Sequence, residues 1–327
     1  MSWLAGPVTV AVPATSANLG PGFDSFGLAL GLHDVVVAQI APGGLTVQVT
    51  GEGAAAASAG EQHLVVRAMR TAFAHIGATP PGLALSCQNE IPQGFGLGSS
   101  AGAICAGLLA ARALAGPAGT AALPDDTILA LATKMEGHPD NVAACLAGGL
   151  TIAWHPAGTA GTAGPGGSAG SAGARVARLA PLPGIAPVLC VPAAPLPTVT
   201  ARQVLPPQVP LADAAANSAR AALLVTALTS QPDLLMDATE DFLHQAYRAA
   251  AMPATARLIA ALRAAGVPAV VSGAGPSVLA LTVTGEQGGS GGVGGSGEVA
   301  AIAAADAADW RVLPLRVDTA GATAQAR

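Results

Sequence analysis

Charged and aromatic residues are scarce in this sequence, and their scarcity excludes several classes of protein. Of the 327 residues, 10% are charged and 3% are aromatic, and the net charge is −5 at pH 7. Because there is no basic cluster, nucleic acid is not expected as a partner. Hydrophobic residues make up 51%. Even so, no apolar run reaches the roughly 18 residues that a membrane-spanning helix needs, and Arg112 interrupts the longest candidate. We therefore expect a soluble protein without a membrane partner.

Paired cysteines and a secretory signal are also missing. The cysteines have no CxxC spacing and lie in apolar surroundings, so we interpret them as buried reduced thiols; they are Cys87, Cys105, Cys145 and Cys190. The first basic residue is Arg67, so the N-terminal segment lacks the positive region of a secretory signal and a cytoplasmic location is expected. A chain of this length is long enough for two domains.

The most informative segment is PQGFGLGSSAG, at residues 92–102. It follows an alternating segment at residues 82–91 and opens an alanine-rich segment of helical period, so we expect a strand, a glycine-rich turn and a helix. The three glycines allow positive φ angles, and Ser99 and Ser100 fall at the helix N-terminus, where an anion is favoured. The pattern predicts a phosphate-binding loop, although an ordinary capped turn can look the same. It is not a Walker A loop, because Lys134 is the only lysine.

A second candidate loop follows the first strand of the chain. Residues 8–14 alternate like a strand, and TSANLGPGFDSFGLAL after them has the chemistry of a turn. The turn carries Asn18 and Asp24, two side chains able to hydrogen-bond a ligand at the end of an apolar strand. Taken alone, it is equally compatible with a bare structural turn.

Polar residues also gather at the junction of two helices near the middle of the chain. The first helix brings Glu136 to its C-terminal end, where the helix dipole disfavours a carboxylate and a compensating cation is indicated. Pairing with Lys134, or simple solvation, explains Glu136 about as well from the sequence alone. His138, Asp140 and Asn141 share the following turn, and we interpret Asp140 as the N-cap of the next helix.

The second half of the chain adds two arginines and a glycine hairpin. Arg202 lies in PTVTARQVLPP, and Arg248 lies in a segment expected to be helical over residues 233–250. Single arginines of this kind are ordinarily solvated surface groups. SGAGPS lies between two strand-like segments within residues 268–283, and this order predicts a tight hairpin.

Three motifs in the expected order make the chain similar to the GHMP kinases. PQGFGLGSSAG resembles the second motif of that superfamily, which includes galactokinase, mevalonate kinase and phosphomevalonate kinase. PATSANLGPGFDSFGLAL, at residues 13–30, resembles the first motif of the homoserine kinases in particular, and HPDN, at residues 138–141, is similar to theirs. SGAGPS, at residues 272–277, resembles the third motif. The likeness covers nearly the whole chain, and three ordered motifs are far more specific than one.

The resemblance implies an α+β fold of two domains with the site in the cleft between them. The N-terminal domain, expected over residues 1–165, is like the second domain of ribosomal protein S5 and carries the ATP-binding loop. The C-terminal domain, expected over residues 166–327, is ferredoxin-like. Glycine-rich stretches at residues 157–174 and 285–298 lack periodicity, so we expect flexible loops there and a domain border near the first.

The same resemblance implies an ATP-dependent homoserine kinase. Such a phosphotransferase phosphorylates the side-chain hydroxyl of L-homoserine to O-phospho-L-homoserine in threonine biosynthesis. ATP and Mg²⁺ are the expected cofactors, and the residues expected to bind ATP are Pro92, Gln93, Gly94, Phe95, Gly96, Leu97, Gly98, Ser99, Ser100, Ala101 and Gly102. Two alternatives stay open: a kinase of another small alcohol such as mevalonate or a sugar, and a catalytically silent sensor of the same fold. The oligomeric state is open too, a homodimer included.

The family's pattern also implies roles for single residues. Ser100, with Ser99 as the second choice, and Glu136 are the expected Mg²⁺ ligands, and together with Asn141 they are the expected catalytic residues. Several relatives place an aspartate in this region as catalytic base, where homoserine kinases have the asparagine. Because an amide cannot take the proton, catalysis is expected to rest on positioning and on Mg²⁺.

The residues expected to bind homoserine come from both halves of the chain; they are Asn18, Asp24, His138, Asn141, Arg202 and Arg248. Recognition of an amino acid calls for a carboxylate to meet its ammonium group and for guanidinium groups to meet its carboxylate. Asp24 and the two arginines carry those charges.

Overall fold

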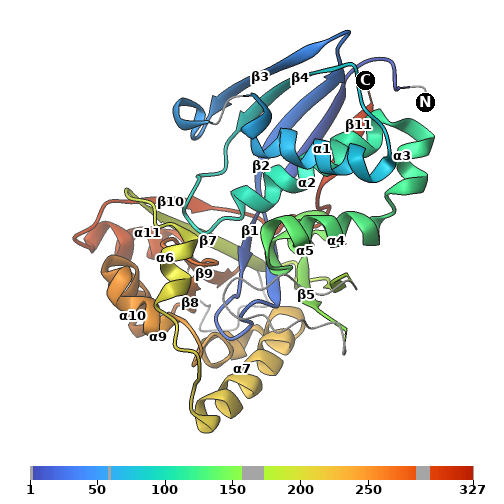
Figure 1. Cartoon of the computed structure of the whole chain (residues 1–327). Coiled ribbons are helices and arrows are strands. Elements are labelled where there is room, and N and C mark those ends of the chain that lie inside the picture. Colours follow the sequence, from blue (N-terminus) through green and yellow to red (C-terminus); the bar gives the residue numbers. More distant parts are fainter. Residues whose placement is uncertain (1–2, 58–59, 157–172, 285–294, 327) are drawn as a thin grey trace.

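The computed structural model describes residues 3–57, 60–156, 173–284 and 295–326. Two β-sheets with flanking helices make up this part of the chain, in agreement with the predicted α+β class (Figure 1). The predicted border between residues 165 and 166 and most of the two glycine-rich stretches lie outside the described residues. Within the described ranges, every helix is too short or too polar to cross a membrane.

The first sheet is built mainly from the first half of the chain. Its strands are β1 (Val8–Ala17), β2 (Phe26–Ile40), β3 (Gly44–Gly51), β4 (Gly82–Asn89), β5 (Leu150–Trp154), β6 (Arg175–Leu179) and β11 (Thr323–Ala326). β1 and β2 form a long antiparallel hairpin, and β4 and β3 extend the sheet beyond β2. Residues 18–25 connect β1 to β2, so the candidate loop that carries Asn18 and Asp24 lies at one end of this hairpin.

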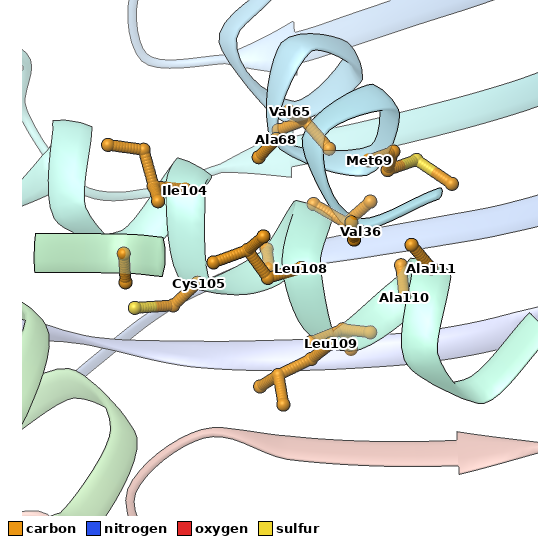
Figure 2. Close-up of a cluster of buried hydrophobic side chains, with 14 of the residues drawn as sticks. Val36, Val65, Ala68, Met69, Ile104, Cys105, Leu108, Leu109, Ala110 and Ala111 are labelled. Carbon is orange, nitrogen blue, oxygen red and sulfur yellow. The ribbon is translucent and has the colours of Figure 1, made fainter. Parts of the chain in front are cut away.

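Helices from the first half of the chain cover this sheet. They are α1 (Leu64–Ile76), α2 (Ser99–Leu114), α3 (Gly116–Ala122), α4 (Asp125–Glu136) and α5 (Asp140–Ala147). Alternation in β1 places Val8, Val10 and Val12 in the same core as α1 and α2, and all three are fully buried. Figure 2 shows side chains of α1 and α2 packed together in this core. The two helices approach closely at Gly107, where a Cβ would overlap the carbonyl oxygen of Val65.

The second sheet has the strand order of a ferredoxin-like domain. Its strands are β7 (Ile185–Pro192), β8 (Ala269–Val271), β9 (Val278–Val283) and β10 (Trp310–Pro314). They lie antiparallel in the order β10-β7-β9-β8, which with the intervening helices is the βαββαβ arrangement. α10 (Pro253–Ala264) and α11 (Ser296–Ala305) pack on one face. The predicted ferredoxin-like fold is confirmed.

The other face of the second sheet joins the two halves of the molecule. Successive residues of β7 alternate between two clusters, so Val188 and Cys190 face α10 and α11 whereas Leu189 faces the first half. Leu189 shares its cluster with Leu28 of β2 and Leu97 of the glycine-rich segment. This continuous core holds the glycine-rich segment beside the second sheet.

The remaining helices lie between β7 and α10 in the chain. They are α6 (Thr198–Gln203), α7 (Leu211–Thr229), α8 (Leu235–Ala238) and α9 (Gln245–Arg248). Short 3₁₀ turns occur at Ala54–Ala56, Gly60–Gln62, Pro232–Leu234 and Ala249–Ala251. The single helix predicted over residues 233–250 is wrong, because the chain turns between α8 and α9. There the carboxylate of Asp241 accepts hydrogen bonds from the N–H groups of Leu243, His244 and Gln245, which competes with helical hydrogen bonding.

Two late segments return to the first sheet. β6 pairs with β5, and β11 pairs with β1 in a register that sets Ala326 opposite Val8. The sequence TAQA of β11 has no bulky apolar residue and its side chains are exposed, so no pattern predicted this strand. The placement of the domain border stays a prediction.

Candidate active site

The glycine-rich segment forms the connection between β4 and α2 that the sequence predicts. Gly94, Gly96 and Gly98 have φ angles of 82°, 73° and 67°, in the left-handed region that residues with a Cβ disfavour. A Cβ on Gly96 would also overlap the carbonyl oxygen of Ser272. α2 begins at Ser99 and is 16 residues long, so its first N–H groups and its dipole favour an anion at this point.

The hairpin between β8 and β9 closes over this segment. Ser272 Oγ lies 2.8 Å from the carbonyl oxygen of Gly96 and 2.9 Å from Ser16 Oγ of β1. The N–H of Gly273 donates to the carbonyl oxygen of Ala17 at 3.1 Å. Three segments that are far apart in the sequence therefore meet at the start of α2, and the hairpin that resembles the third motif packs against the loop.

Ser100 and Glu136 lie together where the start of α2 meets the end of α4. Ser100 Oγ donates to Glu136 Oε2 at 2.6 Å. Burial raises the pKa of Glu136, and the hydrogen bond from Ser100 opposes that rise. Within the described ranges, no cluster of three or more His, Cys, Asp or Glu side chains is placed to hold a metal ion. Two adjacent oxygen atoms beside the predicted phosphate-binding loop nevertheless fit Mg²⁺, which takes phosphate oxygens and water as its further ligands.

The turn before α5 links three polar residues. Asp140 is 1% exposed, and its Oδ1 accepts from His138 Nδ1 at 2.6 Å and from the Asn141 N–H at 2.7 Å. Burial opposes the charge on Asp140, but the imidazole outweighs it and holds the pKa of Asp140 below its usual range. The interpretation of Asp140 as an N-cap is wrong, since Asp140 is the first residue of α5 and its carboxylate orients His138.

Asn141 is anchored from β1. Thr15 Oγ1 donates to Asn141 Oδ1 at 2.7 Å, so the amide oxygen is already engaged. The amide NH₂ group lies 3.4 Å from Asp140 Oδ1 and remains the polar group of Asn141 that can donate to a ligand. Thr15 also lies against Gly98, where a Cβ would overlap its hydroxyl.

Asp24 and Arg202 form a bidentate ion pair across the two halves of the chain. Arg202 Nη2 donates to Asp24 Oδ1 at 2.6 Å, and Nη1 donates to Oδ2 at 3.1 Å. Burial opposes the charge on Arg202, but the pairing with Asp24 outweighs it and raises the pKa of Arg202. About a third of each side chain is exposed, so the pair lies within reach of a ligand.

Arg248 is buried beside this pair, where its hydrogen-bond partners are carbonyl oxygens and an imidazole. It is 1% exposed and donates to the carbonyl oxygens of Ala201 and Gly273, at 3.0 Å and 3.3 Å. Burial and the neighbouring Arg202 lower the pKa of Arg248 to about 10, which leaves it charged at neutral pH. A buried cation whose direct hydrogen-bond partners are neutral favours an anionic ligand.

Asn18 shapes the turn between β1 and β2. Its Nδ2 donates to the carbonyl oxygen of Gly273 at 2.7 Å, and its Oδ1 accepts from the N–H of Asp24 at 2.9 Å. Asn18 and Asp24 both have positive φ angles, 67° and 53°, which is uncommon for residues other than glycine. The side chain of Asn18 therefore fixes the backbone that carries Asp24.

One cavity collects most of the predicted site residues. It is lined by Ala17, Asn18, Gly94, Gly96, Leu97, Gly98, Ser99, Ser100, Glu136, His138, Asp140, Asn141, Thr198, Arg202, Arg248, Gly273 and Ala274. The predicted residues outside this lining are Pro92, Gln93, Phe95, Ala101, Gly102 and Asp24. Asp24 is connected to the cavity by its ion pair, whereas Pro92 and Phe95 line a second cavity next to Trp310.

Sequence reasoning assigned no ligand contact to five of the lining residues, of which Ala17 belongs to the first motif. Gly273 and Ala274 belong to SGAGPS, so the third motif was the signal that pointed to them. Asp140 was named, but as a helix cap. Thr198 stands in a proline-rich segment without any pattern that marks it.

Family models match both halves of the chain. The model described as GHMP kinases N terminal domain matches residues 63–149, and the model described as GHMP kinases C terminal matches residues 219–307. The first match spans the glycine-rich segment and the turn before α5. The second begins within α7 and includes α8 to α11 and the hairpin between β8 and β9.

Named relatives are similar over most of the chain. Homoserine kinase of Streptomyces coelicolor is 53% identical over 277 residues, which are 85% of this chain and 85% of that protein. Homoserine kinase of Clavibacter michiganensis is 47% identical over 320 residues, which are 97% of this chain and 94% of that protein. The solved homoserine kinase from Cytophaga hutchinsonii has a TM-score of 0.80 at 24% identity, with 99% of both chains covered, and shows the same fold.

Proposed function

This chain belongs to the homoserine kinase family of the GHMP kinases, and from that premise we propose that it transfers the γ-phosphoryl group of ATP to the side-chain hydroxyl of L-homoserine. The product is O-phospho-L-homoserine, an intermediate of threonine biosynthesis. One observation carries the proposal beyond family membership. The start of α2 with Ser100 and Glu136, and the arginines Arg202 and Arg248, line the same cavity. A phosphoryl donor and an amino acid can therefore be held side by side.

The nucleotide's phosphates are assigned to the start of α2. Positive φ angles at the three loop glycines expose N–H groups there, and the helix dipole adds a positive potential. Ser100 and Glu136 would hold Mg²⁺, which when bound neutralises charge on the phosphate oxygens. The 2.6 Å contact between their oxygen atoms supports this role, because both ligands are already adjacent.

The amino acid is assigned to the opposite side of the cavity. Its ammonium group would meet Asp24, and its carboxylate would meet the guanidinium groups of Arg202 and Arg248. The Asp24–Arg202 pair supports this assignment, because it presents one acidic and one basic group side by side. The acidic group can meet the ammonium group of a zwitterion while the basic group meets its carboxylate. The charges of the two paired residues cancel each other, so Arg248 supplies the net positive charge that the substrate's carboxylate needs.

The chain's own residues would act on the hydroxyl by positioning it. The amide oxygen of Asn141 is taken by Thr15, so the NH₂ group is the part that can donate to the substrate or to the phosphoryl group. Asp140 fixes the ring of His138, which lines the same cavity. Neither contact requires a carboxylate base, in keeping with positioning as the main contribution.

A substrate panel tests the proposed function. Purified protein would be given ATP and Mg²⁺ with L-homoserine, mevalonate or galactose in turn, with ADP release as the rate and phosphorus NMR to identify the product. We expect ADP release with homoserine and a phosphate ester on its side-chain oxygen. Rapid turnover of mevalonate or galactose without homoserine turnover would contradict the assignment. If none of the three substrates is turned over, calorimetry with ATP and Mg²⁺ shows whether the catalytically silent protein still binds nucleotide.

A further inference from the structure

His244 is buried between the arginine and the β1–β2 turn that together form the proposed amino-acid site. It immediately precedes α9, one turn before Arg248, and it is 0% exposed. Its Nδ1 lies 3.0 Å from Nη1 of Arg248, and its Nε2 lies 2.9 Å from the carbonyl oxygen of Gly20. The imidazole therefore contacts both the arginine and the turn that carries Asn18 and Asp24. It is absent from the cavity lining, so it acts on a ligand only through its neighbours.

These contacts define the protonation of the imidazole. A guanidinium has donors only, so His244 Nδ1 accepts from Arg248 and carries no proton. Nε2 then carries the proton of the neutral ring and donates to Gly20. Burial lowers the pKa of His244, which agrees with a neutral ring. Asp241 Oδ2, at 3.7 Å from Nε2, and the more distant Asp24 are the acidic groups that face it.

Phe23 completes the unit around Arg248. The centroids of its ring and the His244 ring are 5.3 Å apart, with an angle of 30° between the planes. The guanidinium groups of Arg202 and Arg248 lie 5.8 Å and 5.7 Å from the centroid of the same Phe23 ring. Arg248 is thus held by neutral acceptors and an aromatic face, none of which cancels its charge.

We propose that His244 is a positioning residue for recognition of the substrate's carboxylate. As the acceptor at Nδ1 it sets the direction of the Arg248 guanidinium, and through Gly20 it fixes that direction relative to the turn with Asp24. The distance between the carboxylate and ammonium sites therefore depends on a residue that touches neither group. This inference rests on the proposed function.

Three substitutions at one position separate the two hydrogen bonds of the ring. His244→Asn places an amide oxygen near the position of Nδ1 and keeps an acceptor for Arg248. His244→Gln extends an amide group toward Gly20 and leaves no acceptor at the δ position, and His244→Ala removes both. We expect the KM for L-homoserine to rise about tenfold in the Ala and Gln variants and about threefold or less in the Asn variant. The KM for ATP should stay within about twofold of the wild-type value in all three.

A ligand without a carboxylate gives the decisive readout. 3-Aminopropan-1-ol has the hydroxyl and the amine of homoserine but no carboxylate, and its binding is measured as an inhibition constant against homoserine. We expect that constant to change less than about twofold in His244→Ala, because the affected contact is never made. The proposal would be overturned if the inhibition constant of the amino alcohol rose as much as the KM for homoserine, or if the KM for homoserine did not change.

Gln245→Ala is the matched control. Gln245 stands next to His244, and its Oε1 accepts from the N–H of Val271 at 2.6 Å rather than from a guanidinium. The variant should lower the melting temperature and leave the preference for the carboxylate-bearing ligand unchanged. Failure of all three His244 variants to fold, seen by circular dichroism, would also contradict the proposal, because His244 would then serve folding. Absence of homoserine turnover in the wild-type protein is a different result and would count against the proposed function instead.

Discussion

The proposed phosphate side and the proposed amino-acid side of the cavity are built in opposite ways. The proposed phosphate side is centred on one contiguous loop and helix start, with Glu136 beside it, and the groups expected to bind phosphate are mainly backbone N–H groups set by glycine φ angles. The amino-acid side is assembled from side chains far apart in the chain, such as Asp24, Arg202 and Arg248. Local sequence therefore determines the first side, whereas the second depends on how the two sheets pack together.

Glu136→Gln should have the largest effect, because it acts on the phosphate side at the carboxylate proposed to hold Mg²⁺. We expect kcat to fall about a hundredfold or more, while the KM for homoserine changes less than about threefold. Steady-state kinetics at saturating ATP measure both constants. Lys134→Ala, on the exposed face of the same helix, is the control and should behave like the wild type. Normal turnover of Glu136→Gln would move the metal ligands elsewhere.

Arg202→Ala acts on the opposite side and should produce the opposite kinetic pattern. We expect the KM for homoserine to rise about 10- to 100-fold with a smaller fall in kcat, because a carboxylate contact is similar in the ground and transition states. The unpaired Asp24 adds to the loss. Arg220→Ala removes an arginine whose ion pair with Glu240 lies outside the cavity lining, and it should leave the KM unchanged. An unchanged KM in Arg202→Ala would remove Arg202 from the site.

Gly96→Ala tests whether the phosphate side depends on backbone shape. A Cβ at this position would meet the hairpin at Ser272, so we expect the KM for ATP to rise about tenfold. Gly266→Ala has a similar φ angle, 82°, but no atom within 4 Å of the added Cβ. It should cost about 1 kcal/mol of stability without altering the KM for ATP. If both variants bind ATP like the wild type, the loop does not hold the phosphates.

The smallest effect is expected outside both sides, at the ion pair between His33 and Asp318. His33 Nε2 lies 2.7 Å from Asp318 Oδ2, and this hydrogen bond raises the pKa of His33. A raised folded-state pKa means that the pair stabilises the protein fully below the ordinary histidine pKa of about 6.5 and loses that effect as pH rises through the raised value.

Thermal unfolding of His33→Gln checks this sign. We expect the variant to melt about 1–2 °C below the wild type near pH 6, with the difference shrinking by about pH 9, since exposed pairs contribute little. Kinetic constants for both substrates should not change. A difference that grows with pH would contradict the direction of the shift.

The contrast between the two sides also explains what could be predicted from the sequence. The strand, turn and helix around residues 92–102 follow from glycine positions and helical period, which are local properties, and the structure confirms them. The helix predicted over residues 233–250 failed because a single side chain, Asp241, takes the N–H groups that a helix would use. Asp140 was misread for a similar reason, since its carboxylate binds an imidazole rather than capping a helix.

Long-range contacts left no readable pattern. β11 gains its place only by pairing with β1, more than 300 residues away in the chain, and Thr15 gains its role only because Asn141 is brought beside it. Likewise, nothing in the segment around His244 indicates that the ring connects Gly20 to Arg248. The charges at Asp24, Arg202 and Arg248 were anticipated through family resemblance, and their contacts with a substrate stay predictions.

A crystal structure with a non-hydrolysable ATP analogue, Mg²⁺ and L-homoserine tests most directly whether the two sides share one cavity. We expect the triphosphate at the N–H groups between Gly94 and Ser100, the metal against Ser100 and Glu136, and the amino acid's carboxylate against Arg248. A nucleotide seated in the second cavity beside Trp310, or a homoserine molecule away from both arginines, would contradict it.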